Sequence, residues 1–258
     1  MVANSHIKLL LISFALAVNI NCKTKTETNS NGFTKIFNGK NLENWEGDTT
    51  YWRVEKGILV GEITPETLLK RNTFIIWKGG TPSDFELKLD FKISDKGNSG
   101  INYRSSLIDT LPFALKGYQG DIDGRNRYTG MSYEERGRTT LARRGEKAVV
   151  NTQPNPENTN SLKDNIISNA WQSSEVVSSL GNPDSLLNYI NNGDWNTFHI
   201  IAKNNRLQHF VNGKLMSDVT DNDTLNRKQS GFIGVQVHTG PPMKIEFKNI
   251  WLKNLNSE

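Results

Sequence analysis

Apolar and polar residues alternate along most of the chain between residues 33 and 254, which is typical of strands that bury one face. The clearest strand is predicted over 84–93, where every second residue from Phe85 to Ile93 is apolar and the residues between them are charged. The runs 51–55 and 58–62 flank Lys56-Gly57 and predict a hairpin. Further strands are expected at 73–77, 99–105, 117–123, 139–142, 146–150, 197–203, 206–212, 231–238 and 243–252.

Many short strands separated by Gly, Asn and Asp turns favour an all-β sandwich or jelly roll of one domain. Residues 151–194 interrupt this pattern. The polar stretch 151–165 contains two prolines and predicts a surface loop, and 182–190 predicts a short helix with Asn182 as its N-cap. No internal repeat or second domain is indicated.

Three of the predicted strands carry polar side chains on the face opposite their apolar one. These side chains are Asn102 and Arg104, then Gln119, Asp121 and Asp123, and finally Gln236 and His238. Because each of these strands also buries an apolar face, the pattern indicates a polar site spread across a sheet.

Several of these groups have a chemical and a structural interpretation. His238 suits a general base or a metal ligand, but it could also only hydrogen-bond the turn that follows it. Asp121 suits acid–base work or metal binding, and it is preferred to Asp123, which begins an Asp-Gly turn. Arg104 could stabilise an oxyanion or form a salt bridge across the sheet.

The segment 132–138 has the composition of a charged, solvated turn. Glu134 or Glu135 could nevertheless extend over a sheet edge into a cleft. The sequence alone leaves both interpretations open.

The chain has 258 residues, 35% hydrophobic content and a net charge of +4, so it can bury one sizeable core. Its basic residues are scattered and interrupted by glutamates, which argues against a nucleic-acid partner. One cysteine permits no internal disulfide.

The N-terminus predicts export. A short apolar run within residues 1–21 is typical of a signal peptide, and Cys22 follows it as the expected lipidated residue of an envelope lipoprotein. The polar residues 22–32 predict a tether, and 33–254 the folded domain. Any membrane contact is thus expected through a lipid anchor only. The alternative is ordinary cleavage near Ala17, which would leave Cys22 as a spare thiol.

Seven segments in this order and spacing resemble the DUF1080, or 3-keto-disaccharide hydrolase, family. The segments are Phe33–Trp45, Trp52–Gly61, Asn98–Arg104, Gly117–Ile122, Gly193–Asn196, Val211–Gly213 and Gly234–His238. The resemblance implies a concanavalin A-like jelly roll that acts on a keto-sugar or glycoside substrate. It also implies cleavage of 3-keto-glucosides by elimination across C1–C2, followed by hydration.

Carried over by position, the resemblance implies His238, Arg104 and Glu134 as catalytic residues. The implied substrate ligands are Gln119, Asp121 and Gln236, and Asn102 joins them from the shared polar face. No cofactor is certain, but a divalent cation held by Asp121 and His238 is one possibility. The expectation under test is that Arg104, Gln119, Asp121 and His238 converge in one pocket.

Two other functions stay open. A non-catalytic, surface-anchored carbohydrate-binding module would need no ionisable groups on this face. A conventional glycosidase would need paired carboxylates, and Asn126 stands where the acidic strand of jelly-roll endoglucanases has a third acid.

Overall fold

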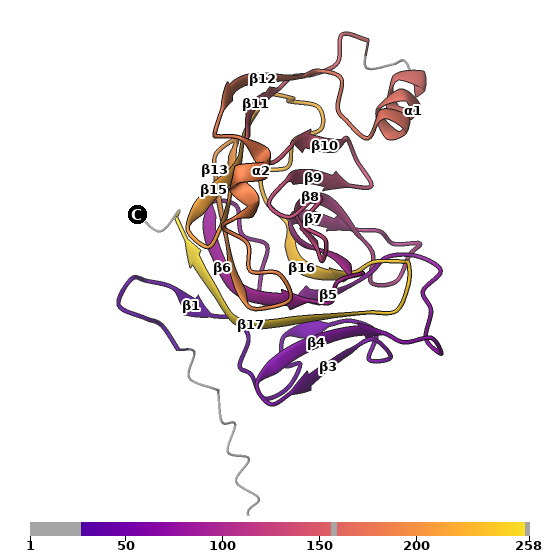
Figure 1. Ribbon diagram of the computed structural model, residues 1–258, viewed down its shortest axis with the longest axis vertical. Helices are drawn as coiled ribbons and strands as arrows, with labels where there is room; N and C mark the ends of the chain where they lie inside the picture. The colour runs from indigo at the N-terminus through magenta and orange to yellow at the C-terminus, as the bar shows by residue number, and fades with distance from the viewer. Residues whose placement is uncertain (1–26, 156–158, 256–258) are drawn as a thin grey trace, which may run out of the picture.

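Two packed sheets account for most of the computed structural model, which describes residues 27–155 and 159–255 (Figure 1). Within this part of the chain, the larger sheet has ten strands and the smaller has seven. Neighbouring strands pair antiparallel except β11 and β15, which are parallel. The predicted signal peptide and Cys22 lie outside the described residues.

In order across the larger sheet, the strands are β12 (Ser174–Ser179), β11 (Glu146–Val150), β15 (Lys214–Asp221), β14 (Arg206–Val211), β13 (Asn196–Lys203), β6 (Phe85–Ile93), β17 (Met243–Asn254), β4 (Ile58–Ile63) and β3 (Trp52–Glu55), with β1 (Thr34–Lys35) pairing beside β17. The smaller sheet runs β10 (Thr139–Ala142), β9 (Ser132–Glu135), β8 (Leu115–Asp123), β7 (Asn98–Leu107), β16 (Phe232–Val237), β5 (Thr73–Trp77) and β2 (Trp45–Glu46).

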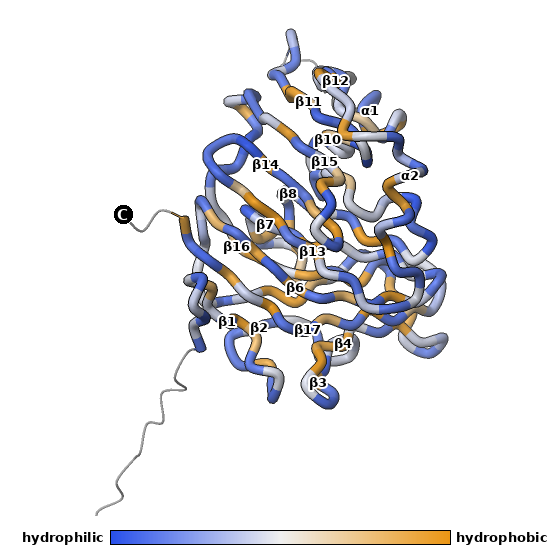
Figure 2. Tube along the Cα trace, turned by 60° about the vertical axis from the view of Figure 1, so that its left-hand side comes forward, coloured by the Kyte–Doolittle hydropathy of each residue, from blue (hydrophilic) through white to orange (hydrophobic). Residues whose placement is uncertain are grey.

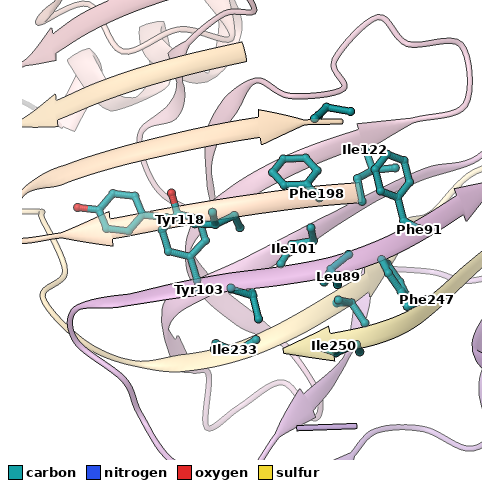
Figure 3. Packing of buried hydrophobic residues seen from close by; sticks show 14 of the residues in the cluster. Leu89, Phe91, Ile101, Tyr103, Tyr118, Ile122, Phe198, Ile233, Phe247 and Ile250 are labelled. Atoms are coloured by element: carbon teal, nitrogen blue, oxygen red, sulfur yellow. The ribbon is translucent and has the colours of Figure 1, made fainter. Parts of the chain in front are cut away.

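The core lies between the sheets, where most strands present an apolar face. Strand β6 alternates strictly between buried and half-buried residues, as predicted, and blue and orange alternate along the strands of the larger sheet in Figure 2. Figure 3 shows Phe91 and Phe247 of the larger sheet together with Ile101 and Ile122 of the smaller one. The predicted jelly-roll β-sandwich is confirmed.

Besides the strands β1, β2 and β15, which the pattern does not predict, four segments differ from the sequence-based expectation. The charged turn 132–138 contains strand β9. The loop predicted over 151–165 is wrong from residue 159 on, because helix α1 (Thr159–Ser168) begins within it, and β12 follows the helix. Helix α2 (Pro183–Leu187) is shorter than expected, but the side chain of Asn182 caps it by accepting from two backbone N–H groups. Within the described residues, no helix is long and apolar enough to cross a membrane.

Candidate functional site

A cavity of about 580 Å³ lies over the face of the smaller sheet that points away from the core. On β8, Tyr118 and Ile122 point into the core, so Gln119 and Asp121 point outward into this cavity. On β16, Val235 and Val237 are core residues, and the side chain of His238, just past the strand, lines the cavity. The predicted alternation therefore gathers polar groups from separate strands.

Gln119 and Asp121 are joined by a hydrogen bond along β8. The Nε2 of Gln119 donates to Oδ1 of Asp121 over 2.8 Å, and Nε2 of Gln236 donates to Oε1 of Gln119 over 3.3 Å. The side chain of Gln119 lies across Gly100, where a Cβ atom would approach its Cδ to 2.4 Å. Glycine at position 100 therefore leaves the space that this amide occupies.

Burial raises the pKa of Asp121 to about 8. The hydrogen bond from Gln119 lowers this pKa, whereas the nearby charges of Glu135 and Asp123 raise it. Burial is the largest of these effects. Asp121 is therefore a protonated carboxylic acid at neutral pH, able to donate a proton.

Glu135 on β9 brings a second carboxyl group to the same cavity. Burial raises its pKa, and Arg136, Asn72, His238 and Gln236 partly offset that effect. The Nδ2 of Asn72 donates to Oε1 of Glu135 over 3.4 Å, while its Oδ1 accepts from the backbone N–H of Thr239 over 3.0 Å. Asn72 thus ties Glu135 to the residue next to His238.

The imidazole of His238 is oriented by its neighbour. Its Nδ1 lies 2.6 Å from the carbonyl oxygen of Thr239. We assign the proton to Nδ1 because a carbonyl oxygen can only accept a hydrogen bond. In the neutral ring, Nε2 then carries the free electron pair that a general base needs.

Glu134, implied as catalytic by the resemblance, does not line the cavity. Its Oε2 accepts from Nε of Arg138 over 2.7 Å, and Arg138 also donates to Asp221 over 2.7 Å and to Asp223 over 3.2 Å. All four side chains are buried. Glu134 points inward because it alternates with Tyr133 and Glu135, which both line the cavity. The structure therefore places Glu134 away from the cavity and its neighbour Glu135 in it.

Arg104 is also absent from the cavity, so the expected convergence of four residues holds for three. A bulge follows Tyr103, and Arg104 itself has a φ of 45°, which breaks the alternation. Its Nε donates to the carbonyl of Ser83 and its Nη1 to that of Asn204, each over 2.7 Å, and Nη2 pairs with Asp84 over 3.0 Å. The salt-bridge interpretation fits this position.

Asn102 and Gln236 face the cavity side of the sheet but are fully buried and do not line the cavity. A small apolar cluster of Phe74, Ile76 and Leu115, with Phe232 packed against it, lies over this part of the smaller sheet. Asn102 lies opposite Gly234, beside which Leu115 packs. Gln236 acts on the cavity through Gln119.

The possible cation site at Asp121 and His238 lacks further ligands. Among the residues that the structure describes, no three His, Cys, Asp or Glu side chains are grouped in a way that could hold a metal ion. No step below is therefore assigned to a metal.

Several residues of the cavity were not expected from the sequence. They are Asn72, Asn98, Tyr128, Tyr133, Arg136, Gly137, Thr139, Thr140, Ile166 and Asn169. Recognising β9 as a strand would have placed Tyr133 and Glu135 on one face. For Ile166 and Asn169, which follow a predicted loop, the sequence offers no signal.

The chain matches the 3-keto-alpha-glucoside-1,2-lyase-like domain over residues 32–253. A solved structure of a "putative glycosyl hydrolase" from Parabacteroides distasonis at 1.70 Å resolution is 20% identical, covering 88% of this chain and 95% of its own, with a TM-score of 0.53. A second structure with this description from that organism, at 2.00 Å, is 19% identical, covering 86% of this chain and 99% of its own, with a TM-score of 0.52. At these identities the likeness is one of fold. No protein with a curated description matches the chain.

Proposed function

Because the chain belongs to the 3-keto-alpha-glucoside-1,2-lyase-like domain family, we propose that it cleaves the glycosidic bond of 3-keto-glucosides by elimination and hydration. Family membership supports a carbohydrate-active enzyme. The finer assignment of the reaction rests on one observation. Two carboxyl groups with raised pKa values, Asp121 and Glu135, share a cavity with the imidazole of His238.

The chemistry of a 3-keto-sugar explains why such a set is useful. The ketone at C3 acidifies the hydrogen on C2, so a base of moderate strength can remove it. The resulting enolate expels the substituent on C1, whose oxygen needs a proton as it leaves. A base and an acid with pKa values near neutrality are therefore sufficient.

We assign His238 as the base and Asp121 as the acid. Nε2 of His238 takes the C2 proton, the C1–O bond breaks, and the protonated Asp121 gives its proton to the leaving oxygen. Water then adds its oxygen to C1 and loses a proton to the Asp121 carboxylate. The His238 imidazolium exchanges its proton with solvent and then protonates C2, so both side chains return to their starting state.

Neighbouring side chains support these two roles. The charge of His238 and the carboxyl of Glu135 interact, so Glu135 would stabilise the imidazolium that forms after proton removal. The negative charge of Glu135 also raises the pKa of Asp121, which favours the acid form. Gln119, Asn98 and Tyr133 line the cavity and offer N–H or O–H donors to the substrate.

The test is to incubate the protein with a 3-keto-glucoside in D₂O and follow both products by NMR. Elimination and hydration place one deuterium at C2 of the released keto-sugar, whereas direct displacement at C1 does not. A plain glucoside, which has no acidified C2 hydrogen, should not react. Binding of glycans without any turnover of the keto-sugar would instead favour a carbohydrate-binding module.

We further propose that the enzyme is exported and anchored by a lipid on Cys22, as the N-terminal pattern suggests. A labelled fatty acid should be incorporated into the wild-type protein but not into Cys22→Ser. The variant should also leave the membrane fraction of the producing cell. Equal labelling of both proteins would contradict the anchor.

A further inference from the structure

The cavity over the smaller sheet has an apolar point on its rim. Almost every side chain that lines it is polar or a tyrosine, but Ile166 near the end of α1 is aliphatic. Ile166 is 59% exposed. An occupant of the cavity with an apolar part could therefore cover this side chain and remove it from water.

The end of α1 is fixed beside the cavity. Asn165, the residue before Ile166, is 1% exposed, and its Oδ1 accepts from the backbone N–H of Gln172 over 2.8 Å. The backbone N–H of Trp171 donates to the carbonyl of Thr140 on β10 over 3.0 Å. Thr140 itself lines the cavity. These bonds hold Ile166 against the same wall.

The cavity has room beyond the acid–base groups. A single sugar ring over Gln119, Asp121 and His238 leaves part of the 580 Å³ unfilled. The polar residues of β8 and β9 can form hydrogen bonds with the hydroxyl groups of a sugar, whereas the side chain of Ile166 can form none. Asn169 and Thr140 beside it are polar, so Ile166 is the point on this side of the cavity that suits a part of the occupant without a hydroxyl.

We propose that Ile166 determines specificity by contacting an apolar, aromatic aglycone of the substrate. This inference rests on the proposed function, since the aglycone is the group released from C1. Aryl 3-keto-glucosides would then be preferred to those with a methyl aglycone. Ile166 takes no part in the chemistry.

The experiment compares Ile166→Ser with Ile167→Ser on phenyl and methyl 3-keto-glucosides. Ile167 is 82% exposed and does not line the cavity, so it controls for the loss of an isoleucine from the same helix. We expect Ile166→Ser to lower the phenyl-to-methyl ratio of kcat/KM about fivefold, and Ile167→Ser to leave it unchanged. An unchanged ratio in Ile166→Ser, or an equal loss in the control, would overturn the inference.

A binding measurement separates this inference from the reaction. Phenyl and methyl glucosides are titrated calorimetrically into the wild type and both variants, because neither compound has a ketone to react. The wild type should bind the phenyl compound about fivefold more tightly, and only Ile166→Ser should lose that preference. Absence of turnover with intact binding preference would defeat the proposed reaction alone. Equal or undetectable binding of both compounds would defeat the aglycone site.

Discussion

Glu134 and Glu135 are neighbours in β9, yet their carboxyl groups lie on opposite faces of the smaller sheet. The Glu134 carboxylate is paired with Arg138 at 2.7 Å inside the protein, whereas Glu135 lines the cavity. Arg138 also faces Asp221 and Asp223, so it is the cation of a buried group of three carboxylates. Glu134 therefore stabilises the β9–β10 turn, whereas Glu135 contributes a carboxyl group to the cavity.

Substitution by glutamine should separate the two roles. Glu134→Gln weakens a buried ion pair and should lower the free energy of unfolding by about 3 kcal/mol. Glu135→Gln removes a charge from the cavity and should lower kcat/KM on a 3-keto-glucoside about 100-fold, with stability changed by less than about 1 kcal/mol. Urea denaturation and initial rates measure both effects. The reverse outcome would return the catalytic role to Glu134.

The sequence predicts most strands because one-sided burial imposes a period of two. Strands β5, β10 and β11 have the bounds that the pattern predicts. Strand β9 is not predicted by this pattern, because Glu134 faces inward and Glu135 faces the cavity, so both faces of the strand are polar. Strand β12 lies at an edge of the larger sheet and is largely exposed, so its valines do not alternate with buried positions.

The candidate site is predictable only where strands are regular. Gln119, Asp121 and His238 reach the cavity because simple alternation holds at their positions. Alternation fails at Arg104 because its positive φ turns the side chain away from the expected face. The sequence gives no sign of a positive φ at an arginine. Asn102 follows the alternation but is buried, and the side chain of Leu115, at the start of β8, packs over Gly234 opposite it, a contact that only the tertiary structure reveals.

Asp121→Asn tests the acid. The pKa of Asp121 is raised to about 8, so its carboxyl is protonated below that pH and kcat/KM should fall as pH rises through about 8. The asparagine variant keeps a hydrogen-bond donor but has no proton to transfer, so kcat/KM should fall by about 10² to 10⁴. The decrease in kcat/KM near pH 8, the alkaline limb of the pH profile, should disappear as well. Glu135→Gln should move the limb to lower pH, since it removes a charge that raises the pKa. A wild-type limb retained in Asp121→Asn would assign it to another group.

Gly100→Ala should damage the site at little cost to the fold. The added methyl group would approach the flexible end of Gln119 to 2.4 Å, so this amide must move away from Asp121. We expect kcat/KM to fall about tenfold, because a displaced positioning group costs alignment, while the unfolding free energy changes by less than about 1 kcal/mol. Gly213→Ala controls for loss of a glycine remote from the cavity, although its φ of 79° makes some strain unavoidable. Full activity in Gly100→Ala would show that Gln119 is dispensable.

His209 makes stability depend on pH. Burial between the sheets lowers its pKa to about 4, while Nε2 lies 2.8 Å from the hydroxyl of Tyr103. The unfolded chain binds a proton near pH 6.5 and the folded chain does not. The contribution of His209 to the free energy of unfolding is thus fully present above pH 6.5. It falls by about 3 kcal/mol as the pH drops to about 4.

Comparison with His209→Gln isolates this contribution, because glutamine does not titrate. The difference in unfolding free energy between wild type and variant should shrink as pH falls from 6.5 to 4. Asp121 acts with the opposite sign, since the folded chain binds more protons than the unfolded one up to about pH 8. Both proteins carry Asp121, so its contribution cancels in their difference. A pH-independent difference for His209→Gln would show that His209 does not titrate between these states.

Arg104→Met tests whether this arginine serves the fold or the reaction. The guanidinium is 1% exposed and bonds the carbonyls of Ser83 and Asn204 together with the Asp84 carboxylate. Methionine fills similar space but leaves these acceptors without their donor, so we expect about 3 kcal/mol of lost stability. Since Arg104 does not line the cavity, the folded variant should keep kcat/KM within about twofold of the wild type. Near-native stability with a 100-fold loss of kcat/KM would place Arg104 in the reaction after all.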